Sequence, residues 1–246
     1  MKLALGTVQF GTDYGAFNAE GRPGEAAVAA CLESAEAAGI DTLDTARAYG
    51  ESEAVLGRLG AARRFRIVTK VAPLRGAGPD AVLASVEASL TALGADQLDA
   101  LLIHDASDLA GPGGEAVWAV LDRLLVEDVI ATAGVSVYGP EEAMALAGRY
   151  PIGLVQAPFS VFDQRMRTKG AFAMLNERGV EIHVRSVFLQ GFALADRHGL
   201  DQMADARCGK PTPREFFSRI DLARGRDVGM RQHPLRSDGV DRKSVV

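Results

Sequence analysis

The chain has little of the residue types that mark several specialised classes of protein. Its 246 residues include only two cysteines, Cys31 and Cys208, which support neither a disulfide framework nor a cysteine metal cluster. The four histidines, at positions 104, 183, 198 and 233, show no metal-ligand spacing. The net charge of −5 lacks the positive excess of a general nucleic-acid-binding protein. We therefore expect no metal and no nucleic-acid partner.

The sequence also lacks segments that direct a chain to a membrane or out of the cell. No apolar run approaches the ~18 residues that a membrane span needs. The opening segment MKLALGTVQFG has neither the apolar core nor the small-residue cleavage site of a signal peptide. Hydrophobic residues make up 48% of the chain and charged residues 24%, as in an ordinary globular protein. We expect a cytoplasmic globular protein without a membrane partner.

Short apolar runs alternate with amphipathic segments over the first 190 residues. The predicted strands are Leu3–Phe10, Ile40–Asp44, Arg66–Val71, Leu98–His104, Ala131–Val137, Ile152–Phe159 and Val180–Phe188. Several have no polar alternation, as expected of strands that are buried on both faces of a parallel sheet. Helical stripes lie between them, and one begins at Pro79 and ends before Gly94. This alternation predicts an α/β fold.

Two observations favour a (β/α)8 TIM barrel over a doubly wound sheet. The first βα turn has no G-x-G-x-x-G motif to bind a pyrophosphate. Polar, reactive residues stand at the C-terminal ends of several different strands, which is where barrel enzymes build their active sites.

Four reactive side chains lie at or just beyond consecutive predicted strand ends. Asp44 ends the second strand and Tyr49 follows five residues later, while Lys70 ends the third strand and His104 the fourth. A nearby ammonium lowers the pKa of a tyrosine, a carboxylate keeps the lysine charged, and a histidine can hydrogen-bond a substrate oxygen. The set suits proton delivery to a carbonyl during its reduction. Each residue taken singly also has a structural interpretation, as a cap, a loop tyrosine, a snorkelling lysine or a packed histidine.

The segment around Tyr49 carries a long motif. Residues 39–53, GIDTLDTARAYGESE, resemble the G-x-x-x-x-D-T-A-x-x-Y-G-x-S-E signature of the aldo-keto reductases. The segments LGTVQFG at 5–11, IVTK at 67–70 and LDALLIH at 98–104 are similar to the first, lysine and histidine strands of that family. The resemblance runs through about residue 195. It implies a TIM barrel in which Tyr49 is the general acid, Lys70 and Asp44 lower its pKa, and His104 orients the carbonyl.

The resemblance also implies a cofactor site on the later strand ends. Ser136 and Gln156 would hold the carboxamide of a nicotinamide ring, and Arg185 with Ser186 would lie under the ring or along the pyrophosphate. The implied cofactor is NADPH or NADH. The implied substrate is a small aldehyde or ketone, a class that includes sugar derivatives.

Residues 196–246 differ in composition from the rest of the chain. Residues 1–196 hold 16 Lys and Arg against 25 Asp and Glu, whereas residues 197–246 hold 11 against 7. This segment has no run suited to an eighth buried strand or to the family's C-terminal helices. We therefore predict a barrel-like region at 1–195 and an atypical basic tail at 196–246. The tail has three interpretations: a divergent folded ending, a disordered segment for an acidic partner, or, as we favour, a frameshifted or truncated coding sequence.

Three functions remain open at this point. The first is carbonyl reduction with NAD(P)H. The second is a catalytically impaired or non-enzymatic protein of the same fold that lacks a full cofactor site, for which we expect weak or absent NADPH binding. The third is a Schiff-base aldolase with Lys70 as the nucleophile. The aldolase hypothesis gives no role to the Asp44–Tyr49 signature and ranks behind the others.

Overall fold

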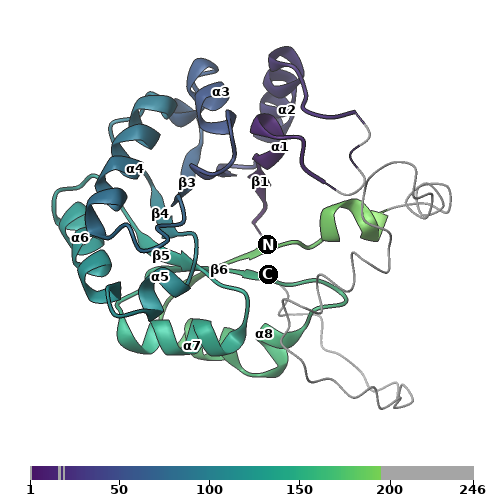
Figure 1. Cartoon of the computed structure of the whole chain (residues 1–246). Coiled ribbons are helices and arrows are strands. Elements are labelled where there is room, and N and C mark those ends of the chain that lie inside the picture. The colour runs from purple at the N-terminus through teal and green to yellow at the C-terminus, as the bar shows by residue number, and fades with distance from the viewer. Residues whose placement is uncertain (1, 16–17, 19, 195–246) are drawn as a thin grey trace, which may run out of the picture. The chain divides into compact units, whose positions relative to one another are not determined.

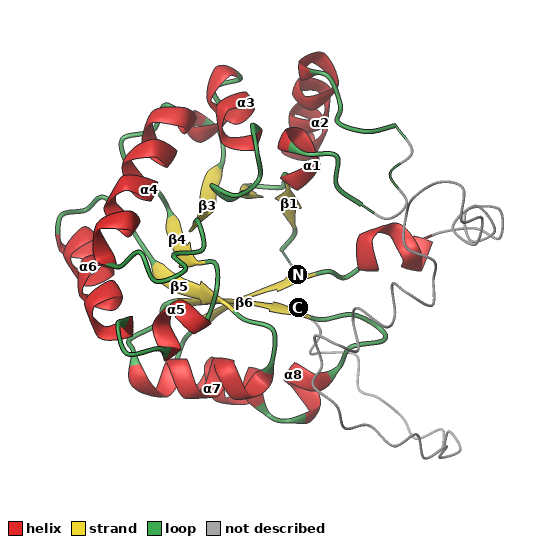
Figure 2. Ribbon diagram, viewed as in Figure 1, coloured by secondary structure: helices red, strands yellow, loops and turns green. Residues whose placement is uncertain are grey.

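Parallel strands form the inner layer of the fold and helices surround them (Figures 1 and 2). The computed structural model describes residues 2–15, 18 and 20–194, of which 4–194 belong to one compact unit. The strands are β1 (Ala4–Gly6), β2 (Thr42–Asp44), β3 (Arg66–Val71), β4 (Ala100–Ile103), β5 (Ala133–Ser136), β6 (Leu154–Pro158) and β7 (Glu181–Arg185). Each strand pairs in parallel with the next one along the chain, in the order β1 to β7.

Helices follow the strands and cover the outer face of the curled sheet (Figure 2). They are α1 (Val8–Gly11), α2 (Glu25–Ala37), α3 (Ser52–Arg58), η1 (Ala61–Arg63), α4 (Pro79–Leu93), α5 (Ser107–Ala110), α6 (Gly114–Val126), α7 (Pro140–Arg149), α8 (Arg165–Thr168), α9 (Ala171–Glu177) and the kinked 3₁₀ segment η2 (Leu189–Leu194). The bounds of α4 follow from its sequence: Pro79 occupies the first turn, and Gly94 ends the helix in the left-handed region at φ 61°. Among the described residues, no helix has the length and apolar character to cross a bilayer.

The parallel order of the strands confirms the predicted α/β fold of the (β/α)8 type. The described residues contain seven strands, and the prediction for the third, Arg66–Val71, agrees with β3 at both ends. The predictions for residues 196–246, including the interpretations of the tail, lie outside the described residues.

The first strand is shorter than predicted. The predicted range Leu3–Phe10 is wrong in its second half, because β1 ends at Gly6 and a helical turn, α1, follows. The chain turns at Thr7, whose backbone N–H and hydroxyl both donate to the carbonyl oxygen of Asp44, at 2.9 and 3.0 Å. The apolar side chain of Phe10 is then buried from a helical turn and not from a strand.

Apolar side chains fill both sides of the sheet. The larger cluster lies between the strands and the helices, with Ile67, Val71, Leu101 and Ile103 among its members. A smaller cluster consists of Val68, Ala100, Leu102 and Leu154. Because successive strand residues face opposite sides, the smaller cluster fills the interior of the barrel. It forms a floor beneath the C-terminal ends of the strands.

Candidate active site

The strand register directs most of the predicted site residues into the barrel. Val68 and Leu102 belong to the interior cluster, so Lys70 and His104, two residues further along, lie on the same inner side. The register pairs Asp44 with Val68, and Ser136 with Gln156, which itself follows the interior residue Leu154 by two positions. The inward positions near the strand ends are thus Asp44, Lys70, His104, Ser136, Gln156 and Arg185.

Lys70 is the centre of the hydrogen-bond network in the site. Its side chain is 1% exposed, and its ammonium donates to Asp44 Oδ1 at 2.6 Å, to the carbonyl of Thr45 at 2.8 Å and to the Tyr49 hydroxyl at 3.4 Å. An ammonium has three N–H donors, so these contacts use all of them. Burial lowers the pKa of Lys70, and the neighbouring Asp44 carboxylate opposes this by favouring the charged form.

The loop that carries Tyr49 is held by buried hydroxyl groups and by a close backbone contact. Ser52 Oγ lies 2.9 Å from both the carbonyl oxygen and the hydroxyl of Thr7, and 3.1 Å from the hydroxyl of Thr45. Gly11 packs so closely against this loop that a Cβ atom there would stand 1.8 Å from the carbonyl oxygen of Tyr49. These contacts fix the loop against the end of β1.

The environment of Tyr49 keeps its phenol protonated. Burial raises the pKa of Tyr49, the negative charge of Asp44 raises it further, and Arg185 opposes both effects. This direction is opposite to the lowering that we expected from Lys70, because the ammonium is paired with Asp44 and the side chain of Tyr49 is half-buried. A protonated phenol is the form that can give a proton to a reacting oxygen.

His104 faces Tyr49 across the site. The two rings meet edge to face with centroids 5.9 Å apart, and His104 Nδ1 is buried without a hydrogen-bond partner among the described residues. Burial, with the positive charges of Lys70 and Arg185, lowers the pKa of His104 to about 4, so the imidazole is neutral at pH 7. The described part of the chain contains no group of three His, Cys, Asp or Glu residues arranged to hold a metal ion.

Gln156 has an amide oxygen that fits the expected cofactor group. Its Nε2 donates to Asp44 Oδ1 at 2.7 Å, while its Oε1 is buried without a partner among the described residues. An unpaired buried acceptor costs free energy until a donor reaches it. Ser136 lies beside Gln156 in the sheet and is also buried. The pair therefore offers a carboxamide both an acceptor and a hydroxyl.

The two predicted residues at the end of β7 differ in their surroundings. Arg185 donates to the carbonyl of Val137 at 3.0 Å, and its guanidinium stacks 4.4 Å from the ring centroid of Tyr138. Ser186 is exposed and has a left-handed backbone with φ 61°. The structure thus places Arg185 inside the barrel mouth and Ser186 on its surface.

Two tyrosines near the site escaped the sequence-based prediction. Tyr14 and Tyr138 both contribute to the electrostatic environment that raises the pKa of Tyr49. Tyr138 follows the end of β5 by two residues, and Tyr14 lies in the segment after β1. Tyr49 was identified because it follows the end of a predicted strand. The same criterion could have identified Tyr14 and Tyr138.

The sequence matches the Aldo/keto reductase family over residues 2–216. The chain belongs to this family. The matched range continues into the segment 196–246, past the limit of the sequence resemblance at about residue 195. The chain is 30% identical over 231 residues to the 6-dehydroglucose reductase of Agrobacterium fabrum, covering 85% of this chain and 76% of that protein. It is 48% identical over 69 residues to the oxidoreductase sirO of Leptosphaeria maculans, covering 26% of this chain and 21% of that relative.

Solved structures of family members share this fold. A candidate aldo-keto reductase of Pseudomonas aeruginosa superposes with a TM-score of 0.66 at 26% identity, covering 82% of this chain and 79% of that one. An aldo/keto reductase of Klebsiella pneumoniae, solved with NADP and acetate, gives a TM-score of 0.64 at 24% identity, covering 83% of this chain and 71% of that one.

Proposed function

We propose that the protein reduces an aldehyde or ketone with hydride from NAD(P)H, with Tyr49 as the general acid. One observation carries this proposal: a single buried ammonium, Lys70 Nζ, hydrogen-bonds both the Asp44 carboxylate and the Tyr49 hydroxyl. Reduction of a carbonyl by hydride needs a proton donor for the oxygen, and the conjugate base of that donor must be stabilised when the proton leaves. The Lys70 ammonium supplies that stabilisation.

The proposed proton transfer uses each member of the group. Tyr49 donates its proton to the carbonyl oxygen as negative charge develops there, and becomes a phenolate. The Lys70 ammonium, 3.4 Å away, stabilises the phenolate, and Asp44 keeps the buried lysine charged. His104, neutral at pH 7, hydrogen-bonds the same carbonyl oxygen and orients it. Proton delivery then coincides with reduction of the carbonyl carbon.

A nicotinamide cofactor bound at this site would supply the hydride. We propose that Gln156 and Ser136 hold its carboxamide, and the unpaired Oε1 of Gln156 supports this assignment. We assign Arg185, with Ser186, to the ring or the pyrophosphate, since the guanidinium is an inward-facing cation at the barrel mouth. The Klebsiella relative contains NADP, which supports NADPH as the first cofactor to test.

We propose a small carbonyl compound as the substrate, with sugar derivatives as the first class to screen. The support is the Agrobacterium relative, whose name states that it reduces 6-dehydroglucose. A screen of aldehydes and keto sugars against NADPH oxidation would rank the candidates.

Tyr49→Phe tests the proposed reaction. The substitution removes only the hydroxyl group, so we expect kcat for carbonyl-dependent NADPH oxidation to fall about 100-fold or more. Tyr150→Phe is the matched control, because Tyr150 donates to the carbonyl of Leu109 in the outer helical layer and lies outside the site. Unchanged turnover in Tyr49→Phe would refute Tyr49 as the general acid.

The geometry of Lys70 argues against the aldolase hypothesis. A Schiff-base lysine must expose a free amine to its substrate, and burial does favour the neutral form here. However, the side chain is 1% exposed and its nitrogen contacts three oxygen atoms. Borohydride in the presence of the carbonyl substrate should therefore leave Lys70 unmodified, as mass spectrometry can establish.

A non-catalytic protein of the same fold is the second candidate. The specific observation in its favour is the exposure of β7, the strand that ends at Arg185, in which every residue is half-buried or exposed. A loosely held cofactor contact would weaken NADPH binding. Titration of NADPH into the full-length protein separates the candidates, since a sub-micromolar dissociation constant would remove the second one.

A further inference from the structure

Glu53 is a buried charged residue that the proposed reaction does not use. It lies in α3 with its side chain 1% exposed, and its carboxylate accepts hydrogen bonds from Thr69 Oγ1 at 2.6 Å and Arg47 Nη1 at 2.5 Å. Burying a carboxylate costs free energy even when it is paired, and an apolar side chain can fill the same space without that cost. A charge at this position therefore points to a role beyond packing.

The two partners of Glu53 belong to two separate parts of the site. Thr69 precedes Lys70 on β3, and because strand neighbours face opposite sides, Thr69 faces the helices while Lys70 faces the barrel interior. Arg47 lies two residues before Tyr49, and its backbone N–H donates to the carbonyl of Lys70 at 3.1 Å. Glu53 thus holds, from behind, the strand that carries Lys70 and the loop that carries Tyr49.

We propose that Glu53 is a positioning residue, whose carboxylate ties the Tyr49 loop to the Lys70 strand and so sets the distance between the ammonium and the phenol. The inference rests on the proposed function, since this distance matters to a reaction only if Tyr49 delivers the proton. Glu53 acts through Thr69 and Arg47 and itself touches no reacting atom.

The charge of Glu53 has a second effect on the same pair. Burial and the positive charge of Arg185 lower the pKa of Lys70, whereas the negative charges of Asp44 and Glu53 raise it. When the charge of Glu53 is removed, less negative charge remains to counteract the lowering of the Lys70 pKa by burial. Lys70 should therefore lose its proton at a lower pH. A neutral amine stabilises a phenolate poorly, and the alkaline limit of the reaction should move down with it.

Glu53→Gln removes the charge while keeping the size of the side chain and an oxygen atom for Thr69. The full-length protein has five lysines, and an NMR titration of the protein with 13C-labelled lysine follows each of them. The Lys70 signal is the one missing in Lys70→Met. We expect its midpoint to move to lower pH in Glu53→Gln, and kcat to fall about ten- to a hundredfold with KM within about threefold of the wild type.

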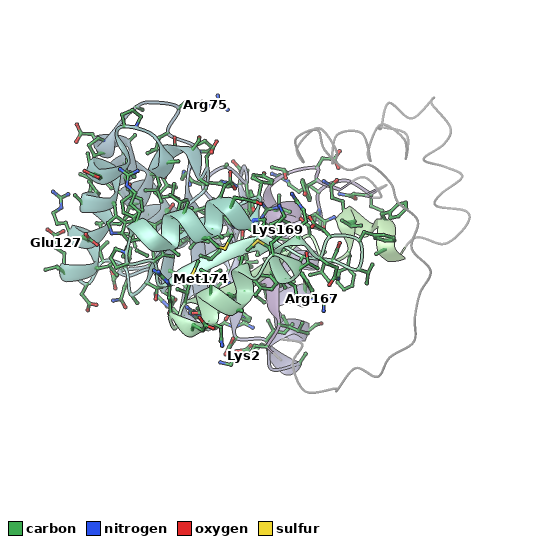
Figure 3. The ribbon with its side chains drawn as sticks, turned by 90° about the horizontal axis from the view of Figure 1, so that it is seen from below. Lys2, Arg75, Glu127, Arg167, Lys169 and Met174 are labelled. Carbon is green, nitrogen blue, oxygen red and sulfur yellow. The ribbon has the colours of Figure 1, made fainter. Side chains whose placement is uncertain are left out.

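Two further variants separate positioning from charge and from general damage. Thr69→Val keeps the charge of Glu53 but removes the hydrogen bond from β3, so kcat should fall while the midpoint of Lys70 stays unchanged. Glu127→Gln removes one negative charge from a side chain that is 53% exposed just after α6, at the outer edge of the molecule (Figure 3), and should alter neither quantity.

The outcomes that overturn the proposal are distinct from those that refute the proposed function. An unchanged kcat in Glu53→Gln overturns it, whatever the Lys70 midpoint does and even if the melting temperature falls, because a glutamate that does not position the reacting groups gives that result. If Glu53→Gln does not fold, wild-type kcat in Thr69→Val overturns it instead. A wild-type protein that reduces no carbonyl refutes the proposed function, and the NMR midpoint, which needs no turnover, then still tests the effect of the Glu53 charge on Lys70.

Discussion

The central strands and the two outer strands of the sheet differ in how deeply their residues are buried. From the second residue of β3 to the fourth residue of β6, every strand residue is buried, whereas β1 and β7 consist of half-buried and exposed residues. Lys70 and Gln156 stand on the buried strands, and Arg185 stands on β7. Lys70, the centre of the proposed proton-transfer group, therefore stands on a buried strand, whereas Arg185, part of the proposed cofactor contact, stands on a strand that is open to solvent.

The largest effect should come from the central group. Lys70→Met removes the ammonium that links Asp44 with Tyr49, so we expect kcat for carbonyl reduction to fall about 1,000-fold. The fall has two causes, because the phenolate loses its stabilising charge and the Asp44 carboxylate loses its ion-pair partner. Steady-state NADPH oxidation measures it, with circular dichroism to establish folding. A loss smaller than tenfold in a folded variant would mean that the buried lysine is structural.

A matched pair of leucine substitutions compares the two regions directly. Leu102 on β4 is fully buried in the interior cluster, and Leu5 on β1 is half-buried. Leu102→Ala should lower the free energy of unfolding by about 2–5 kcal/mol, and Leu5→Ala by about half as much or less, because less apolar surface and a smaller cavity are involved. Urea denaturation gives both values. Equal losses would contradict the contrast between central and outer strands.

A smaller effect should appear at the base of β7. Arg66 on β3 donates to both carboxylate oxygens of Glu181 at 2.6 and 2.8 Å. Arg66, with a smaller contribution from the neighbouring His183, lowers the pKa of Glu181 from 4.5 to about 2. The ion pair therefore stabilises the fold fully above pH 4.5, and this stabilisation is lost as the pH falls from there through 2. Because the two side chains are 30% and 41% exposed, solvent screening limits the effect to about 1 kcal/mol or less.

Glu181→Gln isolates that contribution from other acid-induced changes. The wild type should lose more stability than the variant between pH 5 and pH 2, and their denaturation midpoints should converge at the acid end. Parallel curves over this range would show that the bridge between β3 and β7 adds nothing to stability.

The smallest effect concerns His104, for which we expect almost none at ordinary pH. Burial and the nearby positive charges bring the pKa of His104 to about 4, so its charge does not change between pH 5.5 and 7.5. kcat should therefore show no histidine-dependent step in this interval, and the NMR titration of the His104 ring should have its midpoint near the same low value. A midpoint near 6.5 would indicate that the ring is more hydrated than its position suggests.

Much of the fold could be predicted from local patterns, as β3 illustrates. Four of the six residues of Arg66–Val71 are β-branched, a type that favours strands, and the buried strand has the same ends as the prediction. The end of β1 could not be predicted in this way. The apolar run continues through Phe10, whereas the strand ends before Thr7, whose hydrogen bonds reach Asp44, 37 residues away.

The site shows the same division between local and distant information. The residue types of the proton-transfer group and their strand-end positions were visible in the sequence. The contact of Gln156 with Asp44 joins residues 112 apart, and no local pattern records it. Glu53 was part of the recognised motif, yet a glutamate beside a serine at a helix start is ordinarily solvated, and its burial depends on how α3 packs on β3.

The ion pair between Arg66 and Glu181 anchors one end of β7 and leaves the other end without such a link among the described residues. The register places Glu181 at the opposite end of the strand from Arg185, and the ion pair anchors that end across the barrel to β3. At the other end, where the register pairs Arg185 with Pro158, the side chain of Arg185 contacts the carbonyl of Val137 and the ring of Tyr138, which both follow β5. Because the ion pair to β3 holds the Glu181 end, we expect backbone motion to increase along the strand, and backbone amide exchange should quicken from Glu181 toward Arg185. The Arg185 end of β7 can then adjust to a ligand while the Glu181 end and the base of the barrel keep their positions.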